Sequence, residues 1–360
     1  MQRRFGVHGN ALEWLCDFLR DRAQVVGAGG QESDVVALKY GVPQGSVLGP
    51  KRFIEYAEDV TRLLETHELQ YHLFADDMQA LQHGPPADVP RIVSALDNCF
   101  ADISDWCASK RLQLNATKTE VLWFGSAANL RKIPPGSGSV HAGSSVIEPL
   151  SVVRDLGVMI DAQLSMQEHV SRTARSCFFH LRRLRSVRAQ LGRDVTDANL
   201  VAALVLSRLD YCNAVLAELP ASTLAPLQRV LHAAARLVCG LRPRDHVTAS
   251  LKELHWLPIR QRIDYKLCLM VHNVSVGHAP AYLSDILKPV AAVPSRAHLR
   301  DAAEGDFVVP GSRLKLGDRA FSIAAPRAWN RLPTELKLTL STPAFKRGLK
   351  TFLFRTAYAD

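Results

Sequence analysis

The sequence lacks any C-x-x-C pair of cysteines and any long apolar run, and only 7% of its 360 residues are aromatic. The longest stretch without a charged residue, 267–284, is interrupted by His, Asn, Ser and Pro, whereas a membrane-spanning helix needs about 20 predominantly apolar residues. Seven irregularly spaced cysteines without C-x-x-C exclude the usual zinc, thioredoxin and disulfide-framework proteins. We therefore expect reduced thiols in an intracellular protein, nuclear or cytoplasmic, with no membrane partner.

What the sequence does contain is enough apolar material for packed cores, together with an uneven distribution of charge. Its 47% of hydrophobic residues, with 21 Gly and 19 Pro, is ordinary for a globular protein and excludes a disordered chain. A length of 360 residues suits about two domains. Residues 1–160 carry 15 Lys and Arg against 19 Asp and Glu, and residues 161–360 carry 29 against 16. The mildly acidic first part favours binding of metal ions, and the strongly basic second part favours binding of polyanions.

Apolar spacing predicts which segments are helices and which are strands. The first part mixes both around a loop rich in Gly and Pro, and from Met166 the spacing becomes mainly helical. Helices are predicted over 10–22, after 50, and over 90–107, 172–188, 197–209, 224–241, 259–274 and 343–353; strands are predicted over 35–40, 71–81 (a hairpin), 120–124, 156–160, 307–309 and 320–325.

Two short apolar runs around Asp76 and Asp77 predict a β-hairpin with both carboxylates at its tip, because Asp tolerates the positive φ of tight turns. Adjacent carboxylates repel each other, so a protein that places two together usually has a cation to neutralise them. Mg²⁺ suits such a place because it takes hard oxygen ligands, typically one or two carboxylates plus substrate phosphates. A polar turn that binds nothing is the alternative, since Asp is common in turns.

The order of four segments is more specific than any one of them. A loop dense in Gly and Pro comes first, then the Asp-Asp hairpin, then a segment around a lysine and finally a short strand. They read GVPQGSVLGP (41–50), FADD (74–77), LQLNATKTEVLWFG (112–125) and DLGVMID (155–161). In this order they resemble the palm of the reverse transcriptases of non-LTR, LINE-type retrotransposons. FFHLRR (178–183) and LHWLP (254–258) resemble the thumb and C-terminal region of the same elements, so the resemblance covers nearly the whole chain.

The resemblance implies an RNA-directed DNA polymerase that uses Mg²⁺ and holds an RNA template with a DNA primer, as an RNA/DNA hybrid. At the matching positions, Asp76 resembles the metal-binding carboxylate and Asp77 its supporting neighbour. Phe74 fills the variable position beside the primer end. Two such metal ions, about 3.5–4 Å apart, clamp an in-line displacement at phosphorus.

Three more positions resemble parts of the family that touch nucleotide or template. Gln44 and Gly45 match the loop that lies against the template and the incoming nucleotide. Lys118 matches a lysine near the triphosphate that can give a proton to the leaving pyrophosphate. For Lys118, an ordinary surface lysine is the alternative.

The predicted helix over 172–188 carries six arginines and no acidic residue, opposite an apolar stripe. Such a face can dock along phosphates, and binding of this kind weakens steeply with salt. A solvated basic face that binds nothing is the alternative. The candidate nucleic-acid-binding residues are Arg172, Arg175, Arg182, Arg183, Arg185 and Arg188.

The pattern and the resemblance together predict an α+β chain. A truncated reverse-transcriptase palm, an antiparallel sheet with helices, is expected over 1–160. A mainly helical, basic, thumb-like region over 161–260 and a small helical or α+β C-terminal region over 261–360 are expected to follow.

In the family, the first metal-binding carboxylate lies in a strand upstream of the helix that corresponds to the segment starting near Phe5, and this sequence offers no such strand. Asp17 and Asp21 fall in or at the end of a predicted helix instead. We therefore expect the C-terminal part of a reverse transcriptase, inactive alone, with the N-terminal portion of the element's polyprotein missing. Three alternatives stay open: an enzyme completed by another segment or chain, a non-catalytic module that grips RNA or hybrid, and an inherited fragment without function.

Overall fold

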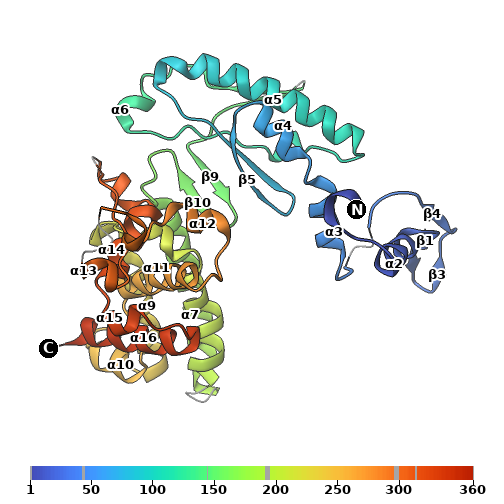
Figure 1. Ribbon diagram of the computed structural model, residues 1–360. Coiled ribbons are helices and arrows are strands. Elements are labelled where there is room, and N and C mark those ends of the chain that lie inside the picture. The colour runs from blue at the N-terminus through green and yellow to red at the C-terminus, as the bar shows by residue number, and fades with distance from the viewer. Residues whose placement is uncertain are drawn as a thin grey trace. The chain divides into compact units, whose positions relative to one another are not determined.

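A computed structural model of the chain describes residues 2–42, 45–143, 145–190, 195–295, 300–312 and 314–359 (Figure 1). The chain divides into two compact units. Unit 1 consists of 1–121 with 128–149, and unit 2 consists of 122–127 with 150–360. Helices predominate, and each named strand pairs antiparallel with one other strand, so the fold is α+β.

Unit 1 places small antiparallel ribbons and short helices before a hairpin and one long helix. The predicted helix over 10–22, the strand over 35–40, the hairpin and the helix over 90–107 all form, with ends shifted by a few residues. The elements are α1 (Gln2–Phe5), α2 (Asn10–Leu19), β1 (Arg22–Gln24), β2 (Gly27–Ala28), β3 (Gln31–Glu32), β4 (Val36–Leu38), α3 (Gly49–Ala57), α4 (Val60–Thr66), β5 (Gln70–Phe74), β6 (Asp77–Leu81), η1 (Pro86–Asp88), α5 (Val89–Ser109), η2 (Ala116–Lys118), β7 (Val140–Ala142) and β8 (Ser145–Ile147), while α6 (Ala127–Leu130) spans the boundary between the units.

The hairpin of β5 and β6 packs one of its faces on helices α4 and α5. Alternate residues of β5, Tyr71 and Leu73, point inward, and Met78 of β6 pairs with Leu73 on the same side. This is the period of two that a half-buried strand requires. The hairpin tip is thereby fixed on a packed base. The buried cluster beneath it consists of Leu64, Leu69, Cys99, Ile103 and Cys107.

One expectation for the front part is wrong. The segment over 120–124 is not a strand: Val121 alone forms an isolated parallel bridge, with Pro149, and the residues after it are irregular. A run of four apolar residues does not by itself distinguish a strand from other buried chain. The described strands pair antiparallel, in ribbons of two strands each.

Unit 2 is mainly helical, as its apolar spacing predicts. It opens with a ribbon of two strands and continues almost entirely in helices. The elements are β9 (Val152–Asp155), β10 (Val158–Asp161), α7 (Gln167–Val187), η3 (Arg188–Gln190), the π-helical η4 (Val195–Leu206), α8 (Ser207–Asp210), η5 (Asn213–Leu216), α9 (Ala221–Cys239), α10 (Thr248–Glu253), α11 (Ile259–Ser275), α12 (Ala281–Ile286), η6 (Val290–Ala292), α13 (Arg300–Ala303), η7 (Gly317–Arg319), α14 (Phe321–Asn330), α15 (Thr334–Lys337) and α16 (Thr342–Tyr358).

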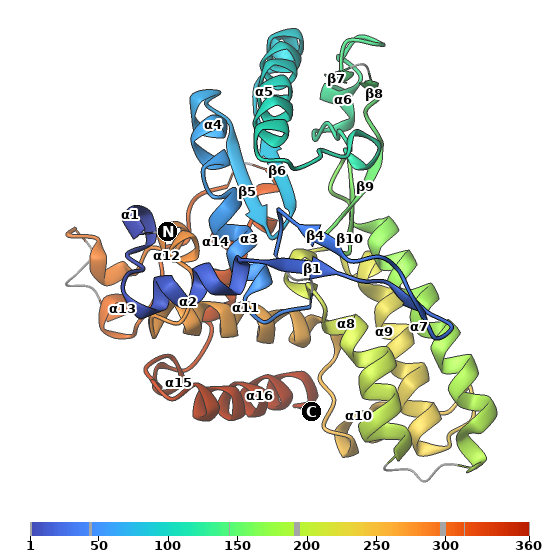
Figure 2. The ribbon, with the colours of Figure 1, turned by 90° about the vertical axis from the view of Figure 1, so that its right-hand side faces the viewer.

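One continuous core joins these helices. Helix α7 runs beside α9, and α11 packs against both α14 and α16 (Figures 1 and 2). Where α11 packs against α16, the His272 ring of α11 stacks on Phe345 of α16, with the ring centroids 4.1 Å apart. Trp329 of α14 lies 5.6 Å from the same Phe345 ring. The large buried rings explain why this helical unit holds together without any disulfide among its cysteines.

Two predicted strands near the C-terminal end are wrong. The segment over 320–325 belongs to helix α14, and of 307–309 only Phe307 makes a bridge, with Pro289. The run Ile323 to Ala325 is buried within the helix, and a short buried apolar run has the same appearance in a helix as in a strand. The closing helix is confirmed as α16, and the Ser341 hydroxyl at its N-cap accepts from the Ala344 N–H at 3.5 Å.

Candidate functional site

The Asp-Asp motif lies at the tip of a two-residue β-hairpin. Phe74 at the end of β5 pairs with Asp77 at the start of β6, which leaves Ala75 and Asp76 as the turn. The positive φ of the turn, 55°, falls on Ala75 and not on either aspartate. The hairpin is as predicted, but the expected reason for the aspartates, their tolerance of positive φ, does not apply. Positive φ therefore does not account for the two aspartates.

Both carboxylates are exposed, and Phe74 beside them is 58% exposed. Neither Asp76 nor Asp77 accepts a side-chain hydrogen bond or forms an ion pair with another described residue. Two exposed oxygen donors fit one Mg²⁺ ion that keeps water and phosphate as its other ligands. A pair of bridged ions needs carboxylates from elsewhere as well. Within the described ranges, no group of three or more His, Cys, Asp and Glu side chains comes together in a way that could hold a metal ion.

The loop expected to touch template and nucleotide is seen only in part. Gln44 lies outside the described residues. Gly45 follows in the left-handed region at φ 79°, exposed and with nothing within 4 Å of the place where a Cβ would stand. After it, the Ser46 hydroxyl accepts from the N–H of Gly49, the first residue of α3, at 3.1 Å. This hydrogen bond joins the loop to the start of α3, whose N-cap residue, Leu48, has no side-chain cap.

Lys118 lies in a tight, side-chain-capped turn. It ends the 3₁₀ helix η2, where the Asn115 side chain accepts from both the N–H and the hydroxyl of Thr117, at 3.1 and 2.7 Å. The Lys118 side chain is exposed and makes no contact with the hairpin tip among the interactions of the described residues. The structure thus leaves Lys118 available to a ligand without bringing it to the two aspartates.

Five of the six candidate arginines line the exposed side of α7, while the opposite side of that helix is buried in the unit 2 core. Arg175 pairs with Glu168 at 3.0 Å, and an Arg172 nitrogen lies 3.3 Å from the Met159 sulfur. No acidic side chain of the described residues pairs with Arg182, Arg183 or Arg185. The exposed five are Arg172, Arg175, Arg182, Arg183 and Arg185.

Arg188 departs from this set. It is half-buried, and its guanidinium donates to the carbonyls of Leu237 and Val238 at 2.6 and 3.0 Å. These carbonyls belong to the last turn of α9, which ends at Gly240 in the left-handed conformation. Arg188 therefore caps a helix C-terminus, where carbonyls lack intrahelical partners and positive charge is favourable. We do not count it with the exposed face.

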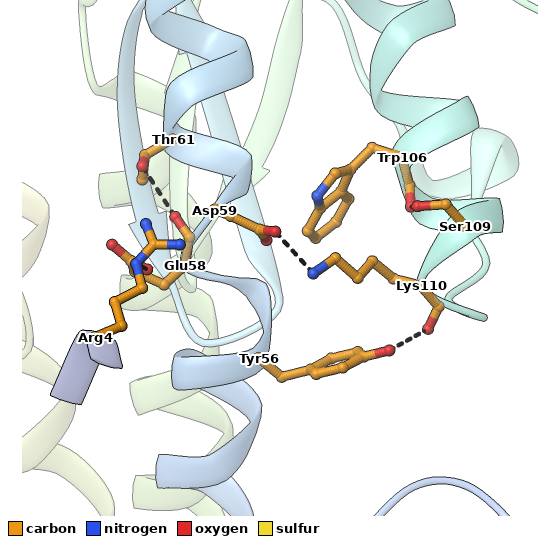
Figure 3. A network of polar contacts seen from close by, with 8 residues as sticks. All are labelled: Arg4, Tyr56, Glu58, Asp59, Thr61, Trp106, Ser109 and Lys110. Carbon is orange, nitrogen blue, oxygen red and sulfur yellow. Dashed lines mark hydrogen bonds and ion pairs between the residues drawn. The ribbon is translucent and has the colours of Figure 1, made fainter. Parts of the chain in front are cut away.

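A polar network that the sequence patterns do not reveal ties α3 and α4 to the end of α5 (Figure 3). Asp59 pairs with Lys110 at 2.7 Å, and the Tyr56 hydroxyl donates to the Lys110 carbonyl at 2.8 Å. Burial raises the pKa of the Asp59 carboxyl, but the hydrogen bond and charge of Lys110 outweigh it and leave that pKa below its ordinary value. The Lys110 ammonium also lies 5.2 Å from the centre of the Tyr56 ring. The partners are too far apart in sequence for any local motif to reveal them.

A nearby ion pair continues this network toward the N-terminus. Arg4 of α1 contacts Glu58 at 2.5 Å, and the Thr61 hydroxyl donates to the Glu58 carbonyl at 2.9 Å (Figure 3). The network has no catalytic geometry of its own. Its effect is to fix the helix that follows the Gly-Pro loop.

No helix in the described parts of the chain is both long and apolar enough to cross a membrane.

Comparison with known proteins gives one family model and several relatives that match part of the chain. Residues 3–159 match the family model of the reverse transcriptase (RNA-dependent DNA polymerase). The chain is 23% identical over 176 residues to a probable RNA-directed DNA polymerase from transposon BS of Drosophila melanogaster, covering 48% of this chain and 19% of that protein.

RNA-directed DNA polymerases from mobile element jockey are similar as well. The Drosophila melanogaster protein is 27% identical over 43% of this chain and 16% of its own length, and the Drosophila funebris protein is 28% identical over 44% and 17%. The matched segment thus spans less than one fifth of each of these relatives. No solved structure matches the chain.

Proposed function

We propose that this chain, whose residues 3–159 carry a reverse transcriptase domain, is part of the RNA-directed DNA polymerase of a retrotransposon and grips RNA or an RNA/DNA hybrid. We further propose that it does not polymerise by itself. The observation that carries the proposal is the FADD hairpin, with its two exposed carboxylates, inside the segment that matches the family.

The proposed Mg²⁺ site consists of the carboxylate oxygens at the hairpin tip. Asp76 and Asp77 would hold one Mg²⁺, which when bound supplies positive charge that stabilises the phosphate oxygens during nucleotide transfer. Exposed and free of other described partners, the two carboxylates are available for this. Carboxylates from a further part of the polyprotein, or from another chain, would complete a site for two ions.

The binding part of the proposal rests on unit 2. The five exposed arginines of α7 present positive charge along one side of a helix whose other side is packed. Phosphate contacts of this kind supply most of the affinity of proteins for nucleic acid and weaken with salt because counterions are released. This face needs no residue from outside the chain, so the chain by itself is expected to grip the hybrid without synthesis.

Primer extension and hybrid binding, measured together, test both claims of the proposal. The chain is incubated with Mg²⁺, deoxynucleotides and a labelled DNA primer on an RNA template, and binding to the same hybrid is measured at low and high salt. We expect salt-sensitive binding without extension. Extension that Asp76→Asn abolishes would overturn the claim that the chain is inactive alone, and absence of binding at low salt would overturn the binding claim.

A further inference from the structure

The exposed face of α7 has an aromatic ring at its centre. Phe179 lies one turn from Arg175, Arg182 and Arg183 and two turns from Arg172, so all four arginines share its side of the helix. The stretch from Arg172 to Arg183 rises about 16 Å along the helix axis. A ring flanked by cations on both sides along this length is an arrangement that proteins use for stacking a base between phosphate contacts.

The Phe179 ring is not part of the core. Its neighbour Phe178 packs against the unit 2 core, whereas Phe179 is 49% exposed. The ring contacts found for Phe179 among the described residues are the Arg183 guanidinium, 5.6 Å from its centre, and the edge of the adjacent His180, 5.4 Å away. Packing within unit 2 therefore does not explain why an apolar ring stands here.

We propose that Phe179 is a stacking platform for an unpaired base of RNA, held by phosphate contacts from the arginines on either side. This inference rests on the proposed function, because it names the form of nucleic acid that the α7 face takes. An aromatic ring can stack on any base whose π-face is open, so the site tolerates any sequence. In a duplex the base faces are already covered by their neighbours, so an interior base pair offers the ring nothing to stack on.

Charge complementarity selects nucleic acid as the occupant. The face carries four guanidinium groups around the ring, and the one acidic partner found for them in the described residues is Glu168, which pairs with Arg175. An Arg guanidinium is planar and can both contact phosphate and lie over a ring, as Arg183 does over Phe179. The Arg183 group would remain beside the ring when a base covers the other side.

The test compares two adjacent phenylalanines. Affinity is measured by fluorescence anisotropy for a single-stranded RNA and for the same strand in an RNA/DNA hybrid, and a 2-aminopurine in the RNA reports stacking. We expect Phe179→Leu to weaken single-strand binding roughly tenfold, about 1.4 kcal/mol, to change hybrid binding less than about twofold and to remove the 2-aminopurine quenching. Phe179→Trp should keep both the single-strand affinity and the 2-aminopurine quenching of the wild type. Phe178→Leu is the matched control, which should lower the melting temperature but leave affinity unchanged.

The possible outcomes are distinct. Equal losses on single strand and hybrid, or no loss on either, would overturn the stacking assignment while salt-sensitive binding by the wild-type chain upholds the proposed function. A chain that binds neither probe would overturn both. A lower melting temperature for Phe179→Leu, with affinity unchanged, would assign the ring a structural role instead.

Discussion

Ala75 is the residue on which the hairpin tip depends, because it adopts a φ of 55° that a side chain with a Cβ disfavours. The two-residue turn requires this conformation between Phe74 and Asp77. The strain is local, and the exposed carboxylates beside it are held in place by the turn.

We predict opposite effects of two substitutions at this position. Ala75→Gly removes the Cβ and should stabilise the chain by less than about 1 kcal/mol, since glycine also loosens the unfolded chain. Ala75→Val should destabilise it by about 1–2 kcal/mol. Urea unfolding midpoints of the three proteins check this. A midpoint raised by Val or clearly lowered by Gly would contradict the assignment of the turn.

Arg188 and Arg182 lie close in sequence but differ in role. We predict that Arg188→Ala lowers the free energy of unfolding by about 1.5–3 kcal/mol, because it removes charged hydrogen bonds to the Leu237 and Val238 carbonyls. It should leave affinity for nucleic acid nearly unchanged. Arg182→Ala should do the reverse. Chemical unfolding measures the stability of both variants, and fluorescence anisotropy measures their affinity for nucleic acid. A loss of affinity without loss of stability in Arg188→Ala would contradict the structure.

Helix α7 is the element on which the proposed nucleic-acid binding depends. Its buried residues recur at helical spacing, and its arginines fall on the other side. Each arginine that contacts a phosphate should add about one to the slope of log affinity against log salt.

Replacing two arginines together tests that relation. We predict that the Arg182→Ala, Arg183→Ala double variant lowers the slope by about two and weakens binding to every sequence alike. Arg347→Ala on the exposed side of α16 removes a charge from a different helix and serves as control. A double variant whose slope equals that of the wild type would mean that these arginines do not meet phosphate.

The long helices and the hairpin could be predicted because their apolar residues repeat with a clear period, as in α5, α7 and β5. The run Ile323 to Ala325 could not be assigned to α14, since both of its sides are buried and no period remains. The capping role of the half-buried Arg188 could not be predicted either, because its acceptors lie some 50 positions away on α9. The two aspartates could be placed at a hairpin tip from the sequence, because the short apolar runs on either side of them predict the two strands.

Across the whole molecule, the four described histidines whose pKa values are lowered all lie in unit 2: His169, His180, His232 and His272. Burial is the first cause for each of them, and neighbouring positive charges lower the pKa further for all but His169. His272 is fully buried between α11 and Phe345. Neutral histidine is thus the form that the folded chain accommodates.

The sign of the resulting pH dependence follows from linkage. In the unfolded chain these histidines have their ordinary pKa of about 6.5, whereas in the folded chain the pKa is lower. Their neutral form therefore contributes fully to the free energy of unfolding above about pH 6.5, and this contribution is lost as the pH falls below it. We predict that the free energy of unfolding decreases between about pH 7 and about pH 5, and that His272→Phe, which can still stack on Phe345, lessens the decrease. Urea unfolding at a series of pH values measures it; a rise in stability on acidification would contradict the burial of these rings.

Ultraviolet cross-linking can show whether nucleic acid lies along α7. A labelled RNA/DNA hybrid with a single-stranded RNA extension is cross-linked to the full chain, and the modified peptides are identified by mass spectrometry. We predict that cross-links concentrate in peptides from Gln167–Val187 and disappear at high salt. Cross-links confined to other helices, with none in α7, would contradict it.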